Sequence, residues 1–320
     1  AYLLSSGSVS IFAYLVFLVV TARIYNPIME VMDNLALLLF LNVRIRRMKE
    51  MDAMPRQEGS ITFHPKNYDI EFSNVDFSYQ EGVQTLKNVS FTANQGDVTA
   101  LVGPSGGGKS TVSKLSARFW DIDKGTITLG GEDISEVDPE TLLKHYSIVF
   151  QDVTLFNSSI MENIRLGKKD ASDKEVIKAA RLAQCDEFVQ RLPQRYETLI
   201  GENGEKLSGG ERQRISIARV FLKNTPIIVF DEATAYADAE NESLIQEAFR
   251  QLAKDKTVIV IAHRLSAIVG ADQILLIDKG TIKERGTHNK LLEQKGLYND
   301  MWQRFAAGES WSLKKNEVTQ

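Results

Sequence analysis

Residues 103–110 read Gly-Pro-Ser-Gly-Gly-Gly-Lys-Ser and fit the spacing Gly-x4-Gly-Lys-Ser of a phosphate-binding loop. The glycines let the backbone curl so that successive N–H groups face a phosphate, while Lys109 can reach the terminal phosphates and Ser110 can ligate Mg²⁺. An apolar run, 98–102, precedes the loop and an amphipathic stretch, 110–119, follows it, which predicts a strand that feeds a helix N-terminus. A flexible Gly-Ser turn is the alternative, but chance produces this spacing in only about one chain in a hundred of this length. The loop therefore predicts nucleotide binding.

A second acidic element is expected to hold the metal from the opposite side. Residues 225–230, Thr-Pro-Ile-Ile-Val-Phe, form an apolar run of the buried-strand type, and the run ends in Asp231 and Glu232. Because adjacent residues at a strand end point in different directions, the two carboxylates are expected to have separate roles. Two solvated acids at a strand end are the alternative interpretation.

The stretch 207–214, Leu-Ser-Gly-Gly-Glu-Arg-Gln-Arg, closely resembles the signature motif of the ATP-binding cassette (ABC) family, whose ATPases work as pairs that share two nucleotides. Ser208, Gly209 and Gly210 open a segment of helical periodicity that runs to about Lys223, and a helix start favours anions. Spacing alone leaves open whether this helix start serves the phosphate loop of its own chain. The resemblance implies that Ser208 and Gly210 reach the terminal phosphate held by a partner subunit.

The resemblance covers about residues 67–308 and implies further roles. In it, Asp231 supports Mg²⁺ through the water shell of the ion, and Glu232 polarises the attacking water. Gln151 senses Mg²⁺ and water, and His263 contacts the terminal phosphate. The implied catalytic residues are Glu232, His263, Gln151 and Lys109, and the implied metal-binding residues are Ser110, Gln151 and Asp231. The implied nucleotide-binding residues are Tyr79, which stacks on adenine, Gly103, Pro104, Ser105, Gly106, Gly107, Gly108, Lys109, Ser110, Thr111, Ser208, Gly209, Gly210 and Asp238.

Two of these residues have plainer interpretations when they are taken alone. A histidine at the end of a buried strand, as at His263, is more often a core group, and Tyr79 alternates with Phe77 as in any strand. The family pattern is also broken at residues 235–238, which read Ala-Tyr-Ala-Asp where the family usually has Ser-Ala-Leu-Asp. Asp238 keeps the position that faces the partner, so the departure concerns communication between the two sites. The Ala-x-Ala-Asp sequence resembles that of exporter-shaped transporters associated with iron siderophores.

The first part of the chain has the character of a membrane span. No charged residue precedes Arg23, and residues 11–20 are continuously apolar, which predicts a transmembrane helix, with a buried core helix as the alternative. Residues 25–28, Tyr-Asn-Pro-Ile, resemble the lower part of the last transmembrane helix of ABC exporters. Basic residues at 44–49 mark the cytosolic side of a span, although they would also suit a solvated helix face. We expect about five further spans upstream in the full-length protein.

These patterns predict an α/β fold, a P-loop NTPase of the ABC ATPase type preceded by one transmembrane helix fragment. Runs 69–75 and 89–93 predict an antiparallel β subdomain, and 98–102, 148–150, 227–230 and 258–261 predict the strands of a RecA-like parallel core. Helical periodicity between 157 and about 223 predicts a helical subdomain. The expected organisation is the last transmembrane helix (1–30), a cytosolic helix extension (31–54), a linker (55–66), the ABC nucleotide-binding domain (67–308) and a flexible tail (309–320).

The hypothesis from sequence is the ATP-hydrolysing subunit of an exporter-type ABC half-transporter in the plasma or inner membrane, with its ATPase domain in the cytoplasm. Its cofactors would be ATP and Mg²⁺, and its partner a second half-transporter, identical or different. A net charge of −4 does not indicate the excess of basic residues that is typical of nucleic-acid-binding proteins, so nucleic acid is not an expected partner. The cargo, whether small molecule, lipid or peptide, is not specified by the sequence. The alternatives are a soluble ABC ATPase without a transport role and a non-hydrolysing sensor, which would require a defect at Glu232 or His263.

Overall fold

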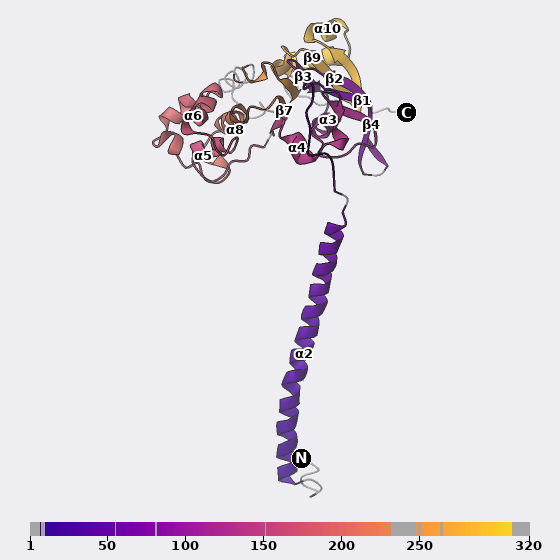
Figure 1. Ribbon diagram of the computed structural model, residues 1–320, viewed down its shortest axis with the longest axis vertical. Coiled ribbons are helices and arrows are strands. Elements are labelled where there is room, and N and C mark those ends of the chain that lie inside the picture. The colour runs from indigo at the N-terminus through magenta and orange to yellow at the C-terminus, as the bar shows by residue number, and fades with distance from the viewer. Residues whose placement is uncertain are drawn as a thin grey trace. The chain divides into compact units, whose positions relative to one another are not determined.

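The computed structural model describes residues 7, 10–54, 56–80, 82–150, 152–231, 248, 251–262 and 265–308. The chain divides into two compact units, Ala1–Arg56 and Gln57–Gln320. The first unit contains the long helix α2, and the second contains the sheets and the shorter helices (Figure 1).

Helix α2 (Ile11–Asp52) is a single helix of 42 residues that begins after Ser10, whose side chain accepts a hydrogen bond from the backbone N–H of Ala13. It is continuous across the boundary expected at residues 30 and 31. Among the described residues it is the one helix long and apolar enough to cross a membrane, judged by length and composition. At ~1.5 Å per residue it extends about 63 Å, roughly twice the hydrocarbon thickness of a bilayer. A span therefore accounts for only part of its length.

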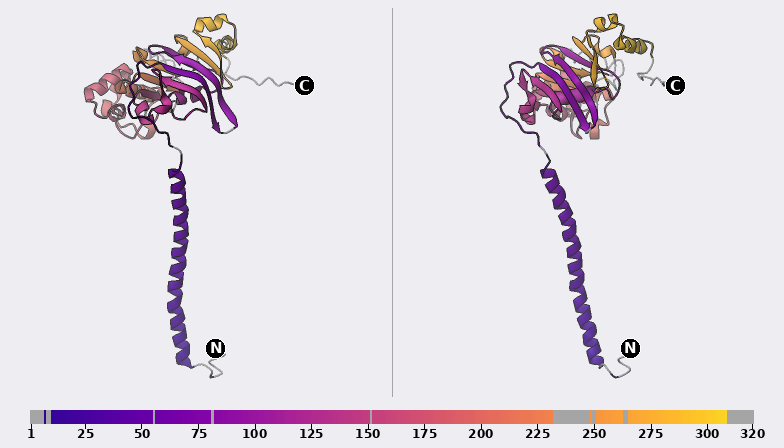
Figure 2. Two further views of the ribbon diagram at one scale, coloured as in Figure 1. Left: turned by 45° about the vertical axis from the view of Figure 1, so that its right-hand side comes forward. Right: turned by 90° about the vertical axis from the view of Figure 1, so that its right-hand side faces the viewer.

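The second unit contains an antiparallel sheet, whose first strands are drawn in purple in Figure 2. Its strand order is β2-β1-β4-β5. Its strands are β1 (Ile70–Gln80), β2 (Val83–Ala93), β4 (Lys124–Leu129) and β5 (Glu132–Asp133). The predicted antiparallel pairing of the first two runs is confirmed, because Ile70 pairs with Ala93 and Phe72 with Phe91. Both strands are longer than the runs from which they were predicted.

A second sheet of six strands has the order β10-β9-β3-β8-β7-β6. Its strands are β3 (Val98–Val102), β6 (Tyr146–Val149), β7 (Ile227–Asp231), β8 (Thr257–Ile261), β9 (Gln273–Asp278) and β10 (Thr281–Gly286). The four predicted parallel strands are confirmed, since β6, β7, β8 and β3 pair in parallel. Two strands were not predicted: β9, which extends the parallel set, and β10, which closes that edge in the antiparallel direction.

The two faces of the six-stranded sheet pack against different layers. Ile227 and Val229 belong to a core shared with the antiparallel sheet and with helix α3 (Lys109–Ser116). Ile228 and Phe230, which alternate with them, belong to a core shared with helix α8 (Gly209–Lys223). Because successive side chains of a strand point to opposite faces, α3 and α8 cover opposite faces of this sheet.

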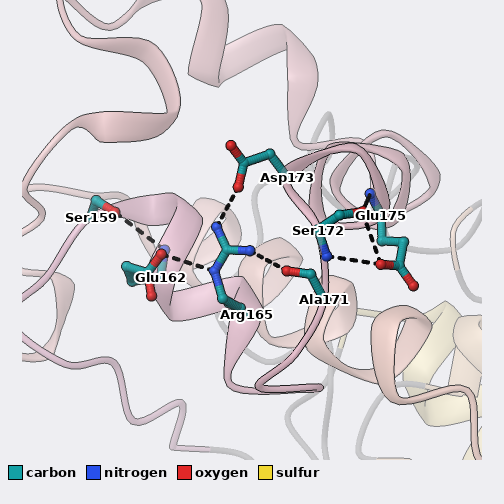
Figure 3. A network of polar contacts seen from close by, with 7 residues as sticks. All are labelled: Ser159, Glu162, Arg165, Ala171, Ser172, Asp173 and Glu175. Atoms are coloured by element: carbon teal, nitrogen blue, oxygen red, sulfur yellow. Dashed lines mark hydrogen bonds and ion pairs between the residues drawn. The ribbon is translucent and has the colours of Figure 1, made fainter.

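Residues 157–223 form the predicted helical region, with α5 (Ile160–Arg165), α6 (Asp173–Leu182) and α7 (Asp186–Arg191) beside α8. Arg165 joins α5 to α6: its guanidinium donates to Glu162 at 2.9 Å, to Asp173 at 2.7 Å and to the carbonyl of Ala171 (Figure 3). The remaining described helices are η1 (Ile134–Glu136), α4 (Pro139–Leu143), η2 (Arg195–Glu197), η3 (Glu202–Gly204), η4 (Leu265–Ile268), α10 (His288–Glu293) and α11 (Leu297–Ala306).

Candidate functional site

The phosphate loop connects β3 to α3, as its spacing predicts. Gly103 has φ +142°, and a Cβ atom there would lie 2.0 Å from the carbonyl oxygen of Ile277. At Gly107 the same oxygen would be 2.8 Å from a Cβ atom. The loop backbone thus runs directly against β9, where a side chain has no room. Gly106, with φ +76°, has no heavy atom within 4 Å of its Cβ position and lies on the open side of the loop.

We predict that Gly103→Ala destabilises the second unit by about 2–4 kcal/mol, because it combines a backbone clash with a disfavoured left-handed conformation. Gly106→Ala is the matched control, since it carries the same type of backbone penalty without the clash and should cost about 1 kcal/mol. Chemical denaturation monitored by circular dichroism measures the difference. Equal losses of stability in the two variants would contradict the close approach to β9.

Lys109, the first residue of α3, is 4% exposed. Its Nζ donates to the carbonyl oxygens of Gly103 at 2.8 Å and Pro104 at 2.9 Å, so the ammonium lies at the loop that it is predicted to serve. The N-cap position of α3 is Gly108, which supplies no side-chain capping bond to the first turn. An uncapped helix start next to a buried ammonium is suited to phosphate oxygens.

The strand order places Asp231 at the same end of the parallel strands as the phosphate loop. It is the last residue of β7 and pairs with Ile261 of β8, which in turn pairs with Leu101 of β3. The carboxylate is half-buried, as is Ser110 in the first turn of α3. A hydroxyl and a carboxylate are hard oxygen ligands, so these two residues fit a Mg²⁺ ion that also binds phosphate oxygens.

Tyr79 lies near the end of β1 and is 45% exposed. Its hydroxyl donates to Oγ1 of Thr111 at 3.3 Å, which brings the ring to the first turn of α3. The structure therefore brings together the phosphate loop, Tyr79 and Asp231. Gln151, Glu232, Asp238 and His263, together with residues 235–237, lie outside the described residues, and their predicted roles stay predictions.

The signature motif forms the start of α8, as expected. Ser208 is the N-cap residue: its Oγ accepts from the N–H of Glu211 at 3.3 Å, and its N–H donates to Oε2 of Glu211 at 2.7 Å. Ser208 is exposed, whereas Gly210 is buried. Since α8 and α3 cover opposite faces of the six-stranded sheet, the signature motif and the phosphate loop belong to different layers of the domain.

Sequence reasoning did not single out Arg219, which connects α8 to the segment that follows Gln151. The guanidinium donates to the carbonyl oxygens of Thr154 at 2.8 Å and Asn163 at 2.7 Å, and to Oδ1 of Asn163 at 2.9 Å. Burial lowers the pKa of Arg219 to about 10. The side chain also lines a cavity of about 260 Å³ together with Asp152 and Lys223. An arginine in the middle of a helix gives no local signal of such partners.

The chain resembles known transport proteins in sequence. The model of the family described as ABC transporter matches residues 86–235. ATP-binding cassette sub-family B member 6 of Mus musculus is 49% identical over 251 residues, which are 78% of this chain and 30% of that protein. The ATP-dependent lipid A-core flippase of Haemophilus influenzae is 47% identical over 248 residues, 77% of this chain and 42% of that protein.

Two further matches extend over more of the chain. The ATP-binding/permease protein YgaD of Bacillus subtilis is 40% identical over 306 residues, 94% of this chain and 53% of that protein. A solved structure of a bacterial Atm1-family ABC exporter with ATP bound superimposes with a TM-score of 0.78 at 40% identity, over 85% of this chain and 48% of that chain. The chain thus spans between 30% and 53% of the length of these curated relatives.

Proposed function

Because the chain contains the α/β ATPase domain of the ABC transporter family, we propose that it is the ATP-hydrolysing part of an exporter-type transporter. The proposal depends on one observation: three features lie together at the carboxyl ends of the parallel strands of the six-stranded sheet. These are a glycine loop pressed against β9, the buried ammonium of Lys109, and the carboxylate of Asp231 two strands away from β3.

The proposed chemistry is positioning and electrostatic stabilisation, as phosphoryl transfer requires. Loop N–H groups and Lys109 hold the phosphates, while Ser110 and Asp231 are the residues that would hold Mg²⁺. When bound, the ion neutralises charge on the phosphate oxygens. Glu232 is proposed to orient and deprotonate the attacking water, with Gln151 and His263 next to the terminal phosphate.

We predict that Asp231→Asn raises the Mg²⁺ concentration needed for half-maximal ATP hydrolysis about tenfold or more, because the amide cannot replace the charge of the carboxylate. ATP binding measured in excess EDTA should be unchanged. Asp300→Asn, which removes an exposed carboxylate of α11, is the control. A Mg²⁺ titration of phosphate release by the purified chain in detergent measures the shift. An unchanged Mg²⁺ requirement would remove Asp231 from the metal site.

The proposed assembly is a membrane-bound dimer. Head-to-tail pairing would bring Ser208 and Gly210 of one subunit to the nucleotide of the other, and the opposite-face positions of α3 and α8 support this arrangement. The partner would be a second half-transporter, identical or different. The length and composition of α2 support a membrane span. The proposed location is the plasma or inner membrane, with the ATPase domain on the cytoplasmic side because basic residues follow the apolar part of the helix. A soluble ABC ATPase without a transport role would not require such a helix.

The suggested link to iron siderophores stays a prediction, because it depends on residues 235–238, which lie outside the described ranges.

A further inference from the structure

Two large aromatic side chains are exposed next to the phosphate-loop helix. Tyr79 is 45% exposed and Trp120 is 41% exposed, and their rings contact each other at a centroid distance of 5.2 Å and an angle of 90°. Tyr79 comes from β1, whereas Trp120 follows the C-terminal end of α3. Neither residue belongs to a hydrophobic core cluster of the described residues.

Both rings lie along one side of α3. The hydroxyl of Tyr79 donates to Thr111 at 3.3 Å, and Nζ of Lys114 lies 5.6 Å from the centre of the Trp120 ring. Thr111 and Lys114 are three residues apart in the helix, so they share a face. The tyrosine ring is also in contact with the buried Phe77, at 4.8 Å and 84°. Tyr79 is therefore restrained by Phe77 from its own strand, by Thr111 at its hydroxyl and by Trp120 at its ring.

The backbone that carries Trp120 is itself held on both sides. Arg118, which is 5% exposed, donates from Nε to Oδ1 of Asp121 at 2.8 Å, so that this ion pair spans Trp120 in the sequence. The guanidinium also donates to the carbonyl oxygens of Val137 and Glu58. Arg118 has φ +53°, an uncommon conformation for a residue with a side chain. A turn held in this way presents the indole ring in a defined orientation.

We propose that Trp120 is a positioning residue for nucleotide binding, which acts by holding the ring of Tyr79 in the orientation that stacks on the base. This inference rests on the proposed function, and within it on the base-stacking role that the resemblance to the ABC family implies for Tyr79. A ring ordered before binding loses less conformational entropy when the base arrives, so the contact contributes to affinity for the base and not to affinity for the phosphates. Edge-to-face pairing of the two rings is worth about 0.5–1.5 kcal/mol, which limits the gain in affinity from ordering Tyr79 to about two- to twelvefold.

The test compares ATP with inorganic tripolyphosphate, which has the phosphates without the base, as ligands of the full chain in detergent. Trp120→Ala should weaken ATP binding about three- to tenfold and leave tripolyphosphate binding within about twofold. Trp120→Phe should restore most of the loss, because a phenyl ring can keep the edge-to-face contact. In the double variant with Tyr79→Ala the loss should equal that of Tyr79→Ala alone, since Trp120 acts through Tyr79. Trp302→Ala, in α11, is the control for loss of a tryptophan elsewhere.

Each outcome decides between the alternatives. Equal weakening of ATP and tripolyphosphate by Trp120→Ala would show that the indole only supports α3, and the proposal would be overturned. An unaltered ATP affinity in Trp120→Ala beside a reduced one in Tyr79→Ala would overturn the proposal and leave the base-stacking role intact. If Tyr79→Ala weakens neither ligand, the base-stacking role and the proposal both fail. If Lys109→Ala also binds both ligands as the parent does, the proposed nucleotide site itself is wrong.

Discussion

Replacement of Glu232 by glutamine is expected to lower ATP hydrolysis about 10²- to 10⁴-fold, the usual contribution of a general base. The amide keeps the size of the side chain but cannot accept a proton from the attacking water. ATP binding should persist, because the phosphate loop and Lys109 are unaltered. The ATP-bound dimer should therefore accumulate. Phosphate release measures the first effect, and size-exclusion chromatography with ATP present measures the second.

The control is Glu293→Gln, which removes an exposed carboxylate at the end of α10. It should hydrolyse ATP at the rate of the parent chain. If phosphate release by Glu232→Gln stays within about twofold of the parent, the assignment of Glu232 as the base is wrong.

The second large effect is expected when two inactive variants are mixed. Lys109→Ala disables the phosphate loop of its own chain. Ser208→Asp keeps the N-cap of α8, because aspartate caps helices as well as serine does, but places a negative charge where a partner's terminal phosphate would lie. Each variant alone should lose about 10²-fold or more in hydrolysis. An equal mixture should recover up to about a quarter of the parent rate, since half of randomly formed dimers would contain one complete site of two.

Recovery requires that Ser208 serves the nucleotide of the other subunit. If it serves its own chain, each variant lacks part of its own site, and the mixture stays as inactive as either variant alone. Phosphate release at saturating ATP measures the recovery. Ser172→Asp is the control. Ser172 caps α6 by reciprocal hydrogen bonds with Glu175 (Figure 3), and Ser208 makes the same type of bonds with Glu211 in α8. It should retain the parent rate.

Much of the fold could be predicted because its signals are local in the sequence. The buried runs that became β3, β7 and β8 are continuous and apolar, and the glycine spacing of the loop is complete within eight residues. Strand β10, by contrast, contains Lys283, Glu284 and Arg285, so its charged sequence does not resemble a buried run. Its place at the sheet edge results from pairing with β9.

In the candidate site, too, some residues could be predicted from local sequence and others could not. The spacing of the glycines predicts the phosphate loop, and the resemblance to the ABC family implies the other residues that we propose to bind nucleotide and metal. Trp120 and Arg219 were not identified, because each acts through partners distant in the sequence: Tyr79 on β1 for Trp120, and Thr154 and Asn163 for Arg219. A lone aromatic or basic residue in a sequence does not indicate which distant groups it will meet.

The sequence by itself determined the phosphate loop, the signature helix start with its Ser208 cap, the helical region and the apolar N-terminal helix, since each depends on residues within a few turns or strands of one another. Only the tertiary structure decided which elements became neighbours. Strand order brought Asp231 to the edge occupied by the phosphate loop, and the alternation of side chains in β7 separated α3 from α8 on opposite faces. These arrangements depend on the packing of whole layers. The free energy of that packing is a sum over many contacts between residues distant in the sequence, so no short stretch of the chain determines it.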